Sequence, residues 1–321
     1  VSAVRLEMTD DNPIGLIGDV VFAKGNIVVA DYERAKSITV YDWDGHYLNS
    51  ISGVGQGPRE YVYTRYISTT PDGSFVTITD PQKLMTFDVD GSFIGSVKLP
   101  FWNFGTEWLG GETYVQTRSS GLDIGKEGYR PCIVASTPDG DIRFSGIPTD
   151  QTEKFNWSFM YYFRKFHQQL FYMPAFNDTI FTIDAKGVTP CYYLDIKRNG
   201  TITTEDKVDN DTFREKLKSL SAYFNDDFID CKDYVLLSLS ESEVKWNRFA
   251  IYAKDRKETF YCTGRFFKDG RYRFICNLYN SAQWFYYKDN IFGIAVPAYD
   301  VLFYKQEMYA LCQSDEKLKA E

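Results

Sequence analysis

One pattern of short strands recurs along the chain, and it constrains the fold more than any other feature. Each copy has an innermost strand, a second apolar strand, a short polar break, a third strand, a tight turn and an outer strand. Equivalent positions of the third strand are separated by 46, 49, 47, 69 and 52 residues. These positions are Ile38, Leu84, Ile133, Ile180, Phe249 and Val301. A repeat of this length with four short strands is the size of one β-propeller blade.

The six copies predict an all-β, six-bladed β-propeller of four-stranded antiparallel blades, which forms a single domain over residues 1–321. In the first copy the expected strands are residues 17–23, 26–31, 37–41 and 47–51. Several copies carry Asp-Gly in the turn before the outer strand. Asp caps such a turn, and Gly adopts a positive φ without steric cost, as a tight connection between strands requires.

One insertion departs from the repeat and predicts a short amphipathic helix at about residues 204–221. Phe213, Leu217 and Leu220 follow the spacing of one helix face, and acidic residues precede basic ones. Such a helix either covers a blade edge or forms a lid over a ligand. A propeller must be closed to avoid unpaired strand edges. We expect residues 4–8, in which apolar and polar residues alternate, to pair with the last sheet as its outer strand. The alternative is that residues 309–312 close the sixth unit.

Composition excludes several classes of function. The chain has 36 Lys and Arg against 44 Asp and Glu, a net charge of −8, so we expect no nucleic-acid partner. No apolar run is long enough for a transmembrane segment. With two His and no C-x-x-C spacing, a zinc site is not expected. No nucleophile or metalloprotease motif occurs, so no catalytic residue is assigned, and His46 and His167 are interpreted as polar turn residues.

The distribution of loop lengths predicts which face carries a binding site. Antiparallel blades place the break after each second strand, and the segment that enters each innermost strand, at the same face. The long segments 119–130, 150–162, 197–227 and 297–299 all fall there, whereas the opposite face receives only tight turns. Aromatic residues that could stack on sugars or anchor a peptide are expected on the long-loop face. They are Trp102, Phe104, Trp108, Phe155, Trp157, Phe159 and Tyr161.

The candidate ligand-binding residues come from the breaks and loops of this face. They are Asp31, Arg34, Asp80, Arg118, Trp157, Asn177 and Asp178. The favoured function is non-enzymatic binding of a protein, peptide or glycan, without a cofactor. The alternative is a metal-assisted hydrolase or lactonase at the central channel, in which Asp31, Asp80 and Asp178 would hold calcium. Against it, such Asp residues commonly accept hydrogen bonds from their own loops.

Two motifs carry a resemblance to a known family. Gly53-Val-Gly-Gln-Gly-Pro-Arg-Glu-Tyr61 and Asn177-Asp-Thr-Ile-Phe181 resemble motifs of the TolB-like six-bladed β-propellers, which include many bacterial envelope lipoproteins. The resemblance implies an exported protein of the cell envelope, in the periplasm or as an outer-membrane lipoprotein, with a lipid-carrying Cys ahead of Val1. The glycine motif is not read as a phosphate-binding loop, because it lacks the Gly-Lys-Ser/Thr ending.

Overall fold

The computed structural model describes most of the chain, in thirteen stretches. These are residues 4–51, 53–62, 64, 66–80, 82–118, 131–148, 163–174, 177–196, 199–200, 210–220, 223–240, 248–263 and 283–295. Two compact units can be distinguished, one of Val1–Asp195 with Ile202–Lys216 and one of Ile196–Thr201 with Leu217–Glu321. Nothing in this division tests the prediction of a single domain, which stays a prediction.

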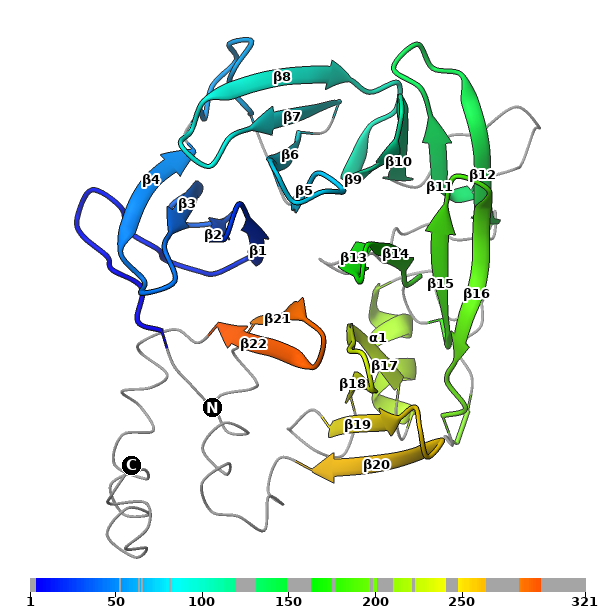
Figure 1. Cartoon of the computed structure of the whole chain (residues 1–321). Coiled ribbons are helices and arrows are strands. Elements are labelled where there is room, and N and C mark those ends of the chain that lie inside the picture. The colour runs from blue at the N-terminus through cyan, green and yellow to red at the C-terminus, as the bar shows by residue number, and fades with distance from the viewer. Residues whose placement is uncertain are drawn as a thin grey trace, which may run out of the picture. The chain divides into compact units, whose positions relative to one another are not determined.

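The first unit contains four blades, each a four-stranded antiparallel sheet (Figure 1). Blade 1 consists of β1 (Asp19–Ala23), β2 (Asn26–Asp31), β3 (Ser37–Tyr41) and β4 (Tyr47–Ile51). Blade 2 consists of β5 (Tyr66–Thr69), β6 (Val76–Asp80), β7 (Lys83–Phe87) and β8 (Phe93–Lys98). Blade 3 consists of β9 (Asn103–Gly110), β10 (Thr113–Arg118), β11 (Pro131–Ser136) and β12 (Ile142–Pro148). Blade 4 consists of β13 (Phe163–Phe166), β14 (Gln169–Tyr172), β15 (Thr179–Asp184) and β16 (Gly187–Tyr193).

The second unit contains blade 5 and a strand pair. Blade 5 consists of β17 (Tyr223–Asp230), β18 (Tyr234–Ser240), β19 (Arg248–Ala253) and β20 (Glu258–Thr263). A two-stranded sheet follows, formed by β21 (Gln283–Lys288) and β22 (Ile291–Ala295). The helix α1 (Asn210–Ser219) precedes β17 and lies within the predicted helical insertion, and its Phe213 is buried.

The predicted number of blades was wrong. In the part of the chain that the structure describes, five sheets have four strands, and the sixth sequence repeat contributes only the β21–β22 pair. Its expected third strand, which contains Val301, lies outside the described residues. β21 nevertheless contacts the innermost strand β17 of blade 5. The repeat spacing therefore located the strands of five blades approximately but overcounted the complete blades.

The strand expected at residues 4–8 was also wrong. These residues form no strand, and they lie against blade 1 rather than pairing with a last sheet. The Glu7 backbone N–H donates to the Gly45 carbonyl at 2.8 Å, and the Glu7 carboxylate accepts from the Tyr47 N–H at 3.0 Å. The rival segment 309–312 lies outside the described residues. No helix among the described residues is long and apolar enough to cross a membrane.

Burial follows the position of a strand within its blade. The second strand β2 is buried at five of its six residues, and Val28 and Ala30 of this strand pack in a cluster with residues of blade 2. The outer strand β8 instead alternates between half-buried and exposed residues, as one covered face requires. Val28, Ile38, Ile67 and Ile78 of blades 1 and 2 share one apolar cluster. Burial between blades thus supplies the hydrophobic stabilisation of the unit.

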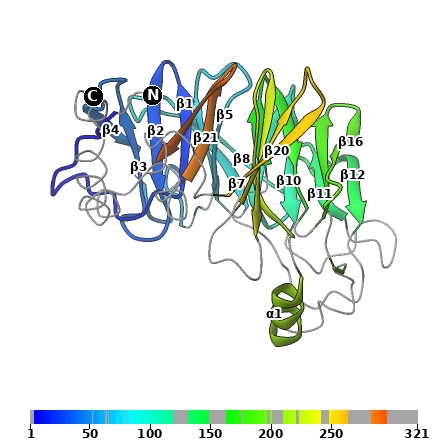
Figure 2. The ribbon, with the colours of Figure 1, turned by 90° about the horizontal axis from the view of Figure 1, so that it is seen from below.

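The connections of blades 1 to 4 differ in length at the two ends of the strands. Figure 2 shows the strands of these blades from the side. At the end that we call the turn end, first-to-second and third-to-fourth strand turns have two to six residues. At the opposite loop end, three connections are longer, with fourteen residues in 52–65, twelve in 119–130 and fourteen in 149–162. The strand order of these four blades agrees with the predicted separation for the long segments 119–130 and 150–162 and for the tight turns, while the segments 197–227 and 297–299 stay predictions.

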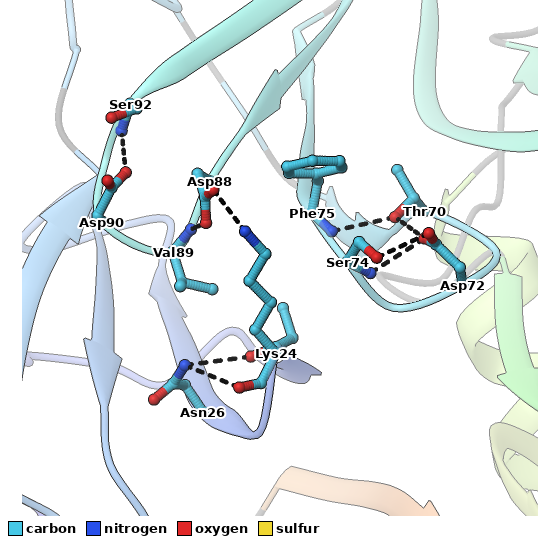
Figure 3. A network of polar contacts seen from close by, with 11 residues as sticks. Lys24, Asn26, Thr70, Asp72, Ser74, Phe75, Asp88, Val89, Asp90 and Ser92 are labelled. Atoms are coloured by element: carbon cyan, nitrogen blue, oxygen red, sulfur yellow. Dashed lines mark hydrogen bonds and ion pairs between the residues drawn. The ribbon is translucent and has the colours of Figure 1, made fainter.

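The turn end of blades 1 and 2 is held by a polar network (Figure 3). The Lys24 ammonium lies 2.5 Å from the Asp88 carboxylate and 4.9 Å from the centroid of the Phe75 ring. The Lys24 backbone N–H donates to the Gly73 carbonyl at 3.1 Å. One turn of blade 1 therefore contacts two turns of blade 2, and these side chains are engaged in joining blades.

Candidate functional site

Asp31 ends β2 at the loop end, and it organises the surrounding backbone. Its side chain is 2% exposed. One carboxylate oxygen accepts the N–H groups of Gly15 and Leu16 at 2.7 and 2.8 Å. The other accepts the N–H groups of Glu33 and Arg34 at 3.1 and 2.8 Å. All four bonds join the entry into β1 to the break after β2, so this carboxylate has little capacity left for a ligand.

The protonation equilibrium of Asp31 reflects these bonds. Burial by itself raises the pKa of the carboxyl, but the backbone N–H groups of Leu16, Arg34, Ala35 and Gly15 outweigh it, and the pKa lies below its ordinary value of 3.8. The folded-state pKa is depressed relative to the unfolded chain. The carboxylate therefore contributes stability above the unfolded value, and this contribution is lost as the pH falls through the folded value.

We expect Asp31→Asn to lower the free energy of unfolding by about 2 kcal/mol at pH 7, because an amide NH₂ would face backbone donors. Urea unfolding at several pH values measures this difference. The gap between the native protein and the variant should shrink below the ordinary carboxyl pKa of 3.8. A gap that stays constant down to pH 3 or lower would contradict this role.

Asp80 occupies the equivalent position at the end of β6 and has a similar role. Its side chain is buried, and its carboxylate accepts the Val62 N–H at 2.8 Å. Val62 lies in the segment that enters the innermost strand of blade 2, as Gly15 and Leu16 do in blade 1. The sequence pattern therefore identified equivalent carboxylates, and the contacts show both as loop-organising groups.

The other candidate residues are placed as follows. Arg34 is exposed, and its side chain packs against Gly15. Asn177 is exposed, and its side-chain oxygen accepts the Thr179 N–H at 2.9 Å. Asp178 is half-buried, and its backbone carbonyl accepts the Leu194 N–H at 2.7 Å. Arg118 is the last residue of β10, and Trp157 lies outside the described residues.

Only one group of potential metal ligands is close together among the described residues. Asp42, Asp44 and His46 place ligand atoms within 4.8 Å of one another in the turn between β3 and β4. The Asp42 carboxylate already accepts the backbone N–H groups of Asp44 and His46, each at 2.9 Å, and it lies 3.1 Å from the His46 ring Nδ1. These bonds cap the turn. His46 is exposed there, as expected for a turn residue. Asp31, Asp80 and Asp178 form no such group.

The glycine motif builds a compact loop around a carboxylate. The Glu60 side chain accepts the Gly57 N–H at 2.8 Å and rests on Gly55, where an added Cβ would lie 1.9 Å from a carboxylate oxygen. The Tyr61 N–H donates to the Gly53 carbonyl at 2.5 Å, and the Gly55 N–H donates to the Tyr61 carbonyl at 3.1 Å. The motif therefore specifies a loop structure, and its polar groups are used within the loop.

A buried polar network on the innermost strands was missed by the sequence reasoning. Glu107 of β9 is 1% exposed. Its carboxylate accepts the Tyr66 hydroxyl at 2.7 Å and lies 3.1 Å from the Lys165 ammonium. The same ammonium donates to the Thr69 carbonyl at 2.8 Å. Burial and the Glu107 charge raise the pKa of Tyr66 well above its ordinary value, so this phenol stays protonated and donates.

This network joins three blades, because Tyr66 belongs to β5 and Lys165 to β13. The available sequence signal was a Glu and a Lys within short apolar strands, where charged residues are rare unless paired. Nothing in the sequence paired them, since 58 residues separate them. The network is fully engaged within the protein, and we assign it a structural role.

Exposed apolar residues occur at the loop end. Val54, Val62 and Trp102 are 54%, 61% and 50% exposed. The prediction for Trp108 was wrong, because it lies near the turn end of β9 and its indole N–H donates to the Gly111 carbonyl at 2.9 Å. The other predicted aromatic residues, at positions 104 and 155–161, are not tested, because the structure does not describe the Phe104 side chain or residues 155–161.

The strands define the class of the molecule: it is a β-propeller with five four-stranded antiparallel blades and one short helix in its described part. Its sequence matches, over residues 1–321, the family described as "domain of unknown function (DUF4934)", and the chain belongs to that family. The resemblance to TolB-like six-bladed propellers was therefore wrong. In this chain the glycine motif serves to build the Glu60 loop.

Two solved structures are similar to the chain at low sequence identity, and the first of them shows the same fold. One is a Bacteroides fragilis protein inferred to be exported, with a TM-score of 0.74 and 14% identity over 99% of this chain and 89% of that chain. Another is a protein of unknown function from Bacteroides caccae, with a TM-score of 0.44 and 9% identity over 78% of this chain and 83% of that chain. No curated protein matches the chain in sequence.

Proposed function

We propose that this chain is a non-enzymatic β-propeller of the cell envelope that binds a protein, peptide or glycan partner at its loop end. The observation that carries the proposal is the contrast between the two ends of blades 1 to 4. Every turn-end connection has at most six residues, whereas three loop-end connections have twelve or more. Rigid scaffolds present binding residues on such long connections.

Exposed side chains at the loop end add to this support. Val62 and Trp102 expose apolar surface there, Arg34 is exposed close to the Asp31 carboxylate, and Asn177 is exposed in the break between β14 and β15. A partly exposed Trp is a common anchor for peptides and for sugar rings. Arg118 and Trp157 remain proposed contributors from the same end.

The alternative, a metal-assisted hydrolase or lactonase, is less well supported. It requires Asp31, Asp80 and Asp178 to ligate one cation, and calcium needs six or more oxygen ligands. Each carboxylate oxygen of Asp31 accepts two backbone N–H groups. A bound metal would have to replace these hydrogen bonds. Elemental analysis of the purified protein, with lactone and ester turnover after calcium addition, tests this alternative directly.

Location in the envelope is the second part of the proposal. It is supported by the similar Bacteroides fragilis structure, which belongs to a protein inferred to be exported. Expression of the protein from its natural gene, followed by fractionation and protease treatment of intact cells, tests it. Recovery of all the protein in the cytoplasmic fraction would contradict it.

We expect Trp102→Ala to reduce capture of the partner about tenfold, because a central aromatic contributes much of an interface's binding free energy. Tagged protein, purified with its cross-linked partners from native cells, is quantified by mass spectrometry, and a glycan array covers carbohydrate partners. Trp43→Ala is the matched control, since Trp43 is also partly exposed but lies in a turn-end loop. If the control loses the partner and Trp102→Ala keeps it, the assigned face is wrong.

A further inference from the structure

The outer strand of blade 5 differs in its pairing from the outer strands of the other four blades. A register shift, as at a β-bulge, interrupts the pairing of β4, β8, β12 and β16 with the third strand of each blade. β20 instead pairs with β19 without a shift, from Glu258 opposite Ala253 to Thr263 opposite Arg248. A bulge bends an edge strand and hinders further pairing, and β20 lacks this protection.

The sequence of β20 does not protect its edge either. Proline and lysine commonly blunt an edge strand, and Lys98 ends β8, Pro148 ends β12 and Pro190 lies within β16. β20 reads Glu-Thr-Phe-Tyr-Cys-Thr and contains neither residue type. No strand in the described part of the chain pairs with its outer edge (Figure 1). Backbone N–H and C=O groups along that edge are therefore available to another strand.

Aromatic side chains are exposed on both faces of β20. Phe260 is 42% and Tyr261 is 67% exposed, and consecutive residues of a strand project to opposite faces. Glu258 and Thr259 are exposed as well. Exposure alone does not distinguish this strand, because Tyr193 of β16 is 75% exposed. The distinguishing feature of β20 is the combination of exposed aromatic residues with a regular, unblunted edge.

The residues of β20 are complementary to a second copy of the same strand. In an antiparallel pair with a two-fold axis between Phe260 and Tyr261, each Phe260 lies opposite the partner's Tyr261, so one aromatic pair forms on each face. Glu258, the only charged residue of the strand, then lies opposite the partner's Thr263, so no like charges face each other. An interface of one strand per copy is small, which predicts a weak dimer that forms as the concentration rises.

We propose that β20 pairs antiparallel with β20 of a second copy of the chain, which joins two four-stranded sheets into one. An extended segment of another protein is the competing occupant of this edge. Such a segment would have to bring its own aromatic residues, whereas a second copy of β20 supplies them in the matching order. The inference does not rest on the function proposed for the loop end, because β20 belongs to none of blades 1 to 4.

Sedimentation velocity of the purified chain at about 1 to 300 µM tests the proposal, with a reducing agent to keep the six Cys from linking copies. The average mass should rise with concentration from that of a monomer toward that of a dimer. Tyr261→Lys should weaken self-association about tenfold or more, because a lysine would replace the aromatic ring opposite Phe260, and it should retain the native unfolding transition. Tyr193→Lys, on the interrupted outer strand of blade 4, is the matched control and should leave self-association unchanged.

A mixture of two variants tests the register of the pairing. Phe260→Glu and Tyr261→Lys should each self-associate weakly, but together they should form heterodimers, because the new glutamate faces the new lysine on one face and the native aromatic pair remains on the other. Monomers at every concentration, or equal effects of Tyr261→Lys and Tyr193→Lys, would overturn the proposal. A photoreactive residue at position 261 that yields adducts in native cells only with another protein would overturn the choice of a second copy.

Discussion

Replacing Lys165 with Met is expected to lower the free energy of unfolding by about 3 kcal/mol, because it leaves a buried carboxylate without its counter-ion. Glu107 is 1% exposed and would retain only the Tyr66 hydroxyl at 2.7 Å. This loss in the free energy of unfolding is smaller than for a fully buried ion pair, because the Lys165 side chain is 22% exposed and solvent screens its charge. Urea unfolding at pH 7 measures the change.

The double variant Lys165→Met with Glu107→Gln distinguishes this cause from lost packing. Removing both charges should recover much of the stability, since a neutral amide needs no counter-ion. Lys186→Met removes an exposed Lys from a turn and should change stability by less than about 0.5 kcal/mol. A double variant no more stable than Lys165→Met alone would show that the charge on Glu107 is not the source of the loss.

Gly55→Ala is expected to destabilise the protein by about 1 to 2 kcal/mol, because the half-buried Glu60 carboxylate has to leave its place and lose its hydrogen bond. The added Cβ would lie 1.9 Å from the Glu60 carboxylate. The carboxylate must then move and give up the Gly57 N–H, and the loop that positions Tyr61 is disturbed. Thermal and urea unfolding measure the change.

Gly95→Ala is the matched control for this prediction. Gly95 lies within β8, has no positive φ, and an added Cβ would meet nothing within 4 Å. Its replacement should therefore be neutral within about 0.5 kcal/mol. In a background that already carries Glu60→Ala, Gly55→Ala should cost much less. Equal costs in the two backgrounds would mean that the glycine is required for a reason other than the carboxylate.

Local sequence features predicted the strands well because short-range chemistry determines them. The expected segments 37–41 and 83–87 coincide with β3 and β7, since alternating or continuous apolar residues are bounded by turns whose Asp and Gly fit tight connections. The count of blades failed because a repeat signal marks each copy without showing that it completes four strands. Residues 4–8 failed because a short alternating segment does not reveal its hydrogen-bond partners.

The roles of the polar residues were harder to predict because their partners are distant in sequence. Asp31 was correctly singled out, but its donors Gly15 and Leu16 precede it by 16 and 15 residues, so the alternative roles of ligand and loop organiser could not be separated. The Glu107–Lys165 pair likewise depends on how strands align. Such contacts become visible only when register is known.

Site-specific photo-crosslinking in native cells tests most directly the claim that the loop end is the binding face. A photoreactive residue is placed at Val62 or Trp102 and, for comparison, at Lys186 in a turn. The account predicts a defined adduct with one envelope protein or glycan from positions 62 and 102 and none from position 186. Adducts from position 186 alone, or from none of the three positions, would contradict it.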